Sequence, residues 1–203
     1  MPYLYLEGFD SAPLSDSEAV TQNYFKGKDY VLIAGNDYPS YTISGVKPGR
    51  VRGGASINFP AYGIGHCSYI GRFVPAGASK AVLAFGWQNT GASGTHRNLS
   101  CPALIQFDSH LDCGVMVALF PDRLLLAIRT NTGDASAAAS GNKVVRKDMN
   151  LSGFNQIALE VTKGTNRVRV FVNGIIQIDT TFVPFASYNL RAVGFGGGEA
   201  AWN

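Results

Sequence analysis

Residues 155–179 read NQIALEVTKGTNRVRVFVNGIIQID, and this stretch decides the fold class. In its first part, Ile157, Leu159 and Val161 alternate with small or polar residues, which is the period-two pattern of a β-strand with one buried face. After a turn-forming KGTN, three valines repeat the pattern, so Arg169 between two of them should face solvent. The stretch therefore predicts an antiparallel meander with one apolar face, which a second sheet must cover.

The VNG at 172–174 predicts a hairpin, for which two registers are open. A two-residue loop would set Val170 opposite the polar Gln177 on the buried face. A three-residue loop would instead set Val170 opposite Ile176. Because register follows the burial pattern, we predict the three-residue loop.

The composition favours one β domain over several small ones. The chain has 203 residues and no segment that resembles an interdomain linker. Charged residues make up 15%, against about 25% in ordinary soluble domains, and glycine is frequent, with 24 residues. Short strand patterns recur throughout. They predict an all-β, two-sheet antiparallel jelly-roll sandwich over residues 1–195 and a flexible Gly-rich tail at 196–203. At most one short helix is expected, beginning after the cap-like residues 15–18 and using Tyr24 and Phe25 on its apolar side.

The charge and hydropathy patterns argue against several classes of protein. The net charge is +3, but the Lys and Arg residues are scattered, whereas a nucleic-acid binder usually carries a basic stripe. No apolar run approaches the ~18 residues of a membrane span, and the N-terminus lacks the basic and apolar segments of a signal peptide. We therefore expect no nucleic acid as a partner, no membrane insertion, and folding in a cytoplasm.

Four motifs, taken in order, carry a family resemblance. They are EGFD at 7–10, RGGASINF at 52–59, the strand pair that contains Phe73 and Phe85, and NQIALEV at 155–161 leading into VFVNG at 170–174. In this order they resemble the concanavalin A-like lectin/glucanase superfamily, particularly its laminin-G-like branch, and also look like the small jelly-roll proteins of tailed-phage particles. The likeness runs from Leu6 to Gly194. The family commonly closes with a further strand carrying acidic residues, and the sequence shows no such strand, so the resemblance leads us to expect a sheet edge that is left open or covered by a neighbour.

The resemblance implies a non-enzymatic structural protein of the virion, a capsid decoration, baseplate or tail component that acts by protein–protein contacts. The expected partners are other virion proteins and further copies of the chain in a homo-oligomer. Trp202, in the Gly-rich tail, lacks a core of its own and should pack on such a partner. The alternative function is that of a lectin-like adhesion module, which binds a host surface glycan.

Catalytic chemistry has little support in the sequence. Glycosidases of this fold resemble one another in an E-x-D-x-x-E strand whose carboxylates flank the sugar, but Glu160 stands alone on its strand. The triplet DSH at 108–110 is no evidence of a catalytic triad, because neighbouring side chains of a strand point to opposite faces. Asp108, Asp112 and Asp134 could join loop carbonyls around Ca²⁺, yet no dense Asp/Asn loop surrounds them. We expect no enzymatic activity, no cofactor and no metal site.

Aromatic residues offer a candidate glycan-binding site. Trp87 ends a predicted strand beside Gln88 and Asn89, and this is the composition of a sugar-stacking platform with amide partners. Tyr62 and His66 could contribute from a neighbouring loop. The alternative, which the clean alternation of the strand favours, is that Trp87 belongs to the core.

Overall fold

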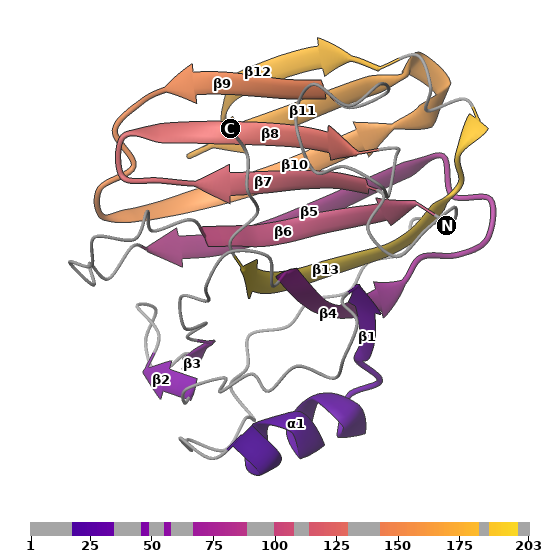
Figure 1. Cartoon of the computed structure of the whole chain (residues 1–203), viewed down its shortest axis with the longest axis vertical. Helices are drawn as coiled ribbons and strands as arrows, with labels where there is room; N and C mark the ends of the chain where they lie inside the picture. Colours follow the sequence, from indigo (N-terminus) through magenta and orange to yellow (C-terminus); the bar gives the residue numbers. More distant parts are fainter. Residues whose placement is uncertain are drawn as a thin grey trace.

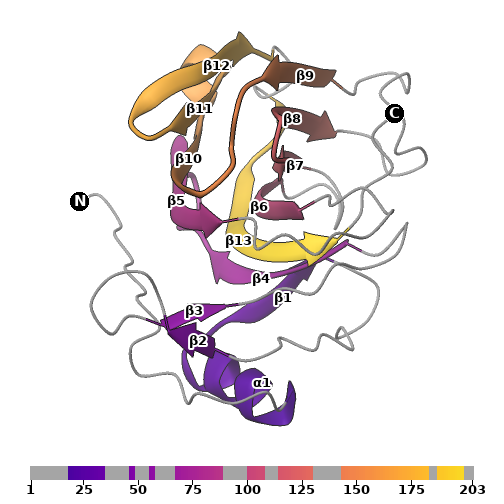
Figure 2. The same cartoon turned by 90° about the vertical axis from the view of Figure 1, so that its left-hand side faces the viewer.

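Two antiparallel β-sheets face each other in the computed structural model of the chain, and helix α1 (Glu18–Gly27) packs at one end (Figures 1 and 2). The structure describes residues 18–34, 46–48, 55–57, 67–88, 100–107, 114–129, 143–182 and 187–198. Within these ranges the architecture is the all-β jelly-roll sandwich with one α-helix that the sequence predicts.

The larger sheet has seven strands and the smaller sheet has four. In spatial order the larger sheet contains β1 (Val31–Ala34), β4 (Cys67–Phe73), β13 (Leu190–Gly198), β6 (Ser100–Phe107), β7 (Gly114–Leu119), β8 (Arg123–Arg129) and β9 (Lys143–Asp148). The smaller sheet contains β12 (Ile175–Thr181), β11 (Arg167–Val172), β10 (Phe154–Thr162) and β5 (Lys80–Gln88), with a short 3₁₀ turn, η1 (Lys163–Thr165), between β10 and β11. A separate two-stranded sheet pairs β2 (Val46–Pro48) with β3 (Ala55–Ile57). Figure 2 shows the smaller sheet on one side and strands β6 to β9 on the other.

The core fills the space between the two sheets. Alternate residues point into it from both sides, as the period-two pattern predicts. The smaller sheet contributes Ile157, Leu159, Val161, Val168, Val170 and Val172, and the larger sheet contributes Ile105, Val115, Val117, Leu124, Leu126 and Ile128. Because these residues face inward, the residues between them on β10 and β11 form the outer face of the smaller sheet.

Aromatic contacts hold helix α1 against the larger sheet. Phe25, in the helix, and Tyr30, just after it, make edge-to-face contacts with Phe195 of β13, at centroid separations of 5.9 and 5.5 Å. Phe25 is buried, as the sequence predicts for the apolar side of the helix, whereas Tyr24 is half-buried. In the described ranges, no helix is both long and apolar enough to cross a membrane.

The hairpin between β11 and β12 differs from the prediction. Its turn contains two residues, Asn173–Gly174, both with positive φ (52° and 81°), and Val172 pairs with Ile175. The predicted three-residue loop is therefore wrong. A β-bulge follows at once, and it sets Val170 opposite Ile178, so an apolar pair still faces the core. The bulge therefore allows a two-residue Asn-Gly turn together with an apolar partner for the buried Val170. A regular two-residue hairpin would instead place the polar Gln177 opposite Val170.

Strand β13 runs further than the sequence predicts. Its last three glycines, at 196–198, pair with residues 67–69 of β4, so the predicted tail does not begin at 196. Trp202 and the EGFD motif at 7–10 lie outside the described residues.

Candidate functional site

The outer face of the smaller sheet carries a row of apolar side chains that crosses all four strands. Ala84 on β5, Ala158 on β10, Phe171 on β11 and Ile176 on β12 are successive register partners. Ile176 is 45% exposed, and the other three are exposed or half-buried. Outward positions of a sheet are usually polar when they face water, so an apolar row across the whole sheet makes this face a candidate contact surface.

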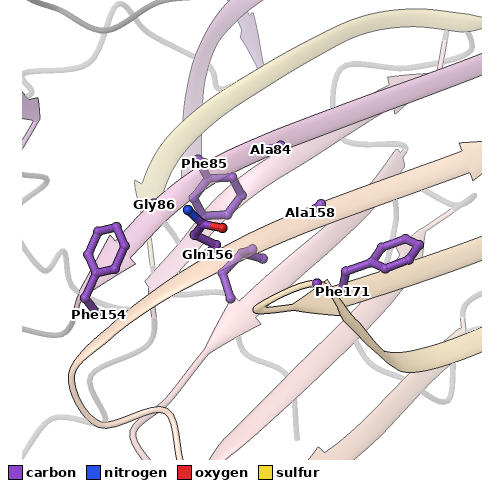
Figure 3. Close-up of a pocket in the computed structure, with 9 residues that line it drawn as sticks. Ala84, Phe85, Gly86, Phe154, Gln156, Ala158 and Phe171 are labelled. Atoms are coloured by element: carbon purple, nitrogen blue, oxygen red, sulfur yellow. The ribbon is translucent and has the colours of Figure 1, made fainter. Parts of the chain in front are cut away.

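An open depression of about 570 Å³ lies along this row. Small residues form much of its lining, and the larger side chains around it include Phe154, Gln156 and Phe171. Figure 3 shows Phe154 and Phe171 at opposite sides of the depression, with Gln156 between them. The site therefore presents two aromatic rings and one side-chain amide around a floor formed largely by small residues.

The ring of Phe154 depends on a glycine in the next strand. A Cβ atom on Gly86 would lie 2.7 Å from Cζ of Phe154 and 2.9 Å from its Cε2. The ring therefore lies directly over Gly86, where only the absence of a side chain leaves room. An aromatic ring over a strand glycine also covers backbone that the glycine would otherwise leave bare.

Asparagines anchor the strand end that holds Gln156. Asn173 accepts a hydrogen bond from the backbone N–H of Gln156 at 2.9 Å, and its Nδ2 donates to Oδ1 of Asn155 at 3.0 Å. The buried Asn155 in turn donates to the carbonyl of Leu151 at 3.1 Å. These bonds tie the Asn173 turn to the start of β10 and thereby fix the backbone from which Gln156 projects.

A charged row borders the apolar row. In register across β10, β11 and β12 it contains Glu160, Arg169 and Asp179. Glu160 is only 8% exposed, and it accepts hydrogen bonds from Nε of Arg169, at 2.8 Å, and from Nη2 of the same guanidinium. Nζ of Lys80, on β5, lies 2.7 Å from the other carboxylate oxygen. Arg169, predicted as a plain surface residue, is instead a half-buried member of this ion network, with 27% of its side chain exposed.

The carboxylates of this row are held in their ionised form. Arg167 donates from Nε to Asp179 at 2.6 Å and forms a second bond through Nη2, and this pairing holds the pKa of Asp179 below its usual value. Burial alone would raise the pKa of Glu160, but the hydrogen bonds and charges of Lys80 and Arg169 outweigh it, and its pKa is also lowered. A general acid needs a raised pKa, so neither carboxylate is suited to protonate a leaving group.

Of the five residues of the predicted glycan site, the structure describes Trp87 and Gln88. Trp87 packs against the core, which is the alternative that its strand pattern favours. Gln88 is exposed on the outer face, in register with Phe154. Tyr62, His66 and Asn89 lie outside the described residues.

The residues that line the depression were missed by the sequence analysis. Phe171 carried a readable signal, because it is an apolar residue on the polar side of an alternating strand. Phe154 and Gln156 carried none, since their place beside β5 follows from register alone.

Metal ligands do not cluster in the described part of the chain, where no group of three His, Cys, Asp or Glu residues could hold an ion. The aspartates considered for Ca²⁺, at 108, 112 and 134, lie outside it.

No family model matches the chain, and no curated protein matches it in sequence. Solved structures with a similar fold include the CBM40 of the Ruminococcus gnavus IT-sialidase bound to α2,3-sialyllactose, at 14% identity and a TM-score of 0.39, which covers 60% of this chain and 65% of that one. The binding domain of botulinum neurotoxin DC, in complex with rat synaptotagmin II, is similar at 8% identity and a TM-score of 0.40, covering 64% of this chain and 32% of that one. A structure of botulinum neurotoxin type C, whose cell entry depends on two ganglioside molecules, has 8% identity and a TM-score of 0.39, covering 67% and 33%. At these values the likeness concerns the sandwich fold alone.

Proposed function

We propose that this protein is a non-enzymatic carbohydrate-binding module that holds its ligand on the outer face of the smaller sheet. The observation that carries this proposal is the pair of rings, Phe154 and Phe171, at either side of an open depression with Gln156 between them. A pyranose ring presents an apolar face of C–H groups and a rim of hydroxyls. Aromatic rings pack against such a face, and amides form hydrogen bonds with the hydroxyls.

The shape and chemistry of the site suit binding rather than turnover. The depression is shallow and open to solvent, as a surface for one stretch of a glycan would be. Its bordering carboxylates, Glu160 and Asp179, are both paired with cations and held ionised. Although the CBM40 structure contains sialyllactose, its fold likeness is too low to transfer a ligand, and the proposal stands on this sheet face.

We test this proposal with a glycan array followed by titration calorimetry on the best ligand. Phe171→Ala should weaken binding by about tenfold or more, because a buried phenylalanine contributes roughly 1.5–3 kcal/mol. Phe154→Ala should weaken it similarly. Phe73→Ala is the matched control, since Phe73 is 52% exposed on the larger sheet and should leave affinity unchanged. Binding that survives both substitutions on the smaller sheet, or an array without any signal, would overturn the proposal.

A second candidate is the structural virion protein that the sequence resemblance implies. Its support is the exposed apolar surface beside the depression on the outer face of the smaller sheet, with Val82 at 50% and Ile176 at 45% exposure. Such a surface could dock another virion protein or a further copy of the chain. In that case the full chain forms an oligomer in light scattering, and Ile176→Asp or Trp202→Ala dissociates it. If the unsubstituted chain and both variants are monomeric while glycan binding is intact, the virion role is contradicted and the carbohydrate-binding function stands.

A further inference from the structure

We propose that the ligand of this face is an acidic carbohydrate and that Arg169 contacts its anionic group. This inference rests on the proposed carbohydrate-binding function and adds the chemical class of the sugar. Three features of the charged row carry it: its charge balance, the bonds that Arg169 leaves unused, and the position of its guanidinium.

The charged row, taken together with Lys80 and Arg167, which pair with its two carboxylates, has more cations than carboxylates. Lys80, Arg167 and Arg169 supply three positive charges, whereas Glu160 and Asp179 supply two negative charges. Asp179 is hydrogen-bonded to Arg167 and also interacts electrostatically with Arg169, while Glu160 pairs with both Lys80 and Arg169. One positive charge is therefore left over on this edge of the depression, where partial burial reduces screening by salt.

Arg169 has donor atoms that its bonds to Glu160 leave unused. Its Nε and Nη2 both donate to the same oxygen of Glu160, while Lys80 pairs with the other oxygen. Nη1 of Arg169 has no hydrogen-bond acceptor among the described residues. A guanidinium that is oriented by one carboxylate and still has donors to offer is well prepared to bind a second anion.

The guanidinium also lies where a ligand on the rings would meet it. Its central carbon is 5.6 Å from the centroid of the Phe171 ring, and Phe171 lines the depression. A sugar packed on this ring with a carboxylate or sulfate at its edge would place that group against Arg169. A neutral sugar at the same place would have no group to pair with the excess positive charge, which water and salt ions alone would then balance.

We test the inference with two matched ligand pairs, each with and without the acid group. Polygalacturonate is compared with its methyl ester, and sialyllactose with lactose, by calorimetry at low and at high salt. We expect an acidic member of at least one pair to bind about tenfold more tightly than its neutral partner, a preference that salt reduces. Arg169→Gln should bring the ratio close to one, whereas Arg169→Lys, which keeps the charge, should retain part of it.

The matched control is Arg191→Gln. Arg191 also lies over a phenylalanine, with its central carbon 5.4 Å from the ring of Phe73, but on β13 of the other sheet. The substitution removes the same charge and should leave the acid preference unchanged. Thermal unfolding of each variant shows whether it is folded, and the salt dependence of the unsubstituted protein tests the inference even if Arg169→Gln does not fold.

The outcomes separate this inference from the function on which it rests. Equal affinity within both pairs, or binding confined to neutral glycans on an array, overturns the acidic specificity and leaves the carbohydrate-binding function standing. An acid preference that persists in Arg169→Gln overturns the role of Arg169. Equally tight binding of polyaspartate would show a general affinity for polyanions and would overturn the inference as well. No binding of any carbohydrate overturns the proposed function itself.

Discussion

The ring of Phe154 lies across Gly86 of the neighbouring strand, so close that a Cβ atom on the glycine would be 2.7 Å from it. One residue therefore supplies the aromatic ring at the edge of the depression, and the other supplies the space for it. Because the colliding atoms belong to the far end of a side chain, a larger residue at 86 would displace the ring rather than unfold the sheet.

Gly86→Ala should therefore impair binding more than stability. Alanine suits a strand better than glycine by about 0.5–1 kcal/mol, and this gain offsets part of the loss from moving the ring, so the unfolding free energy should change by less than about 1 kcal/mol. Ligand affinity should fall about as far as in Phe154→Ala. Gly164→Ala is the control, because a Cβ atom there meets nothing within 4 Å. Unchanged affinity in Gly86→Ala would show that the ring position is not used.

Val170→Ala should destabilise the protein by about 2–4 kcal/mol, because Val170 is fully buried between the sheets. Val82→Ala makes the same chemical change at a position that is 50% exposed, and it should cost under about 0.5 kcal/mol. Urea denaturation of the two variants measures the contrast. Equal losses would contradict the burial of the β11 valines.

Arg169→Ala should cost about 1–2 kcal/mol, more than an ordinary surface change. The substitution leaves the nearly buried Glu160 with Lys80 as its remaining partner. A double-mutant cycle with Glu160→Gln isolates the interaction between the Arg169 and Glu160 side chains. The coupling energy should be stabilising and about 1 kcal/mol. A coupling near zero would mean that the two side chains do not interact in solution.

The stability of the protein should fall on acidification because of the same carboxylate. The pKa of Glu160 is lower in the folded protein than in the unfolded chain, so the unfolded chain binds more protons at acidic pH. Its contribution is fully present above the unfolded pKa of about 4.3 and is lost as the pH falls through the lower, folded pKa. Denaturation followed from pH 6 downward (roughly the range in which carboxylates titrate) should show this loss, and Glu160→Gln should make the curve shallower. An identical pH curve in the variant would rule out Glu160 as a cause.

Much of the fold was predictable because it depends on local alternation. The alternating aliphatic residues of β10 (Ile157, Leu159 and Val161) and the valines of β11 face the core as their period of two requires, and the helix buries Phe25. The same reasoning favoured the core for Trp87, which packs there. Turn register was harder, because the bulge after Val170 depends on a compromise between the Asn-Gly turn and the packing of Ile178.

The sequence by itself determined the two-sheet β fold, the buried faces of its central strands and the presence of a hairpin at 172–174, since each follows from residues that are close together in the chain. Only the tertiary structure decided the outer face. Phe154 meets Gly86, and Glu160 meets Lys80 and Arg169, through the pairing of β5, β10 and β11. Partners across strands are set by register, and register depends on turns, bulges and core packing over the whole sheet, which no short stretch of sequence contains.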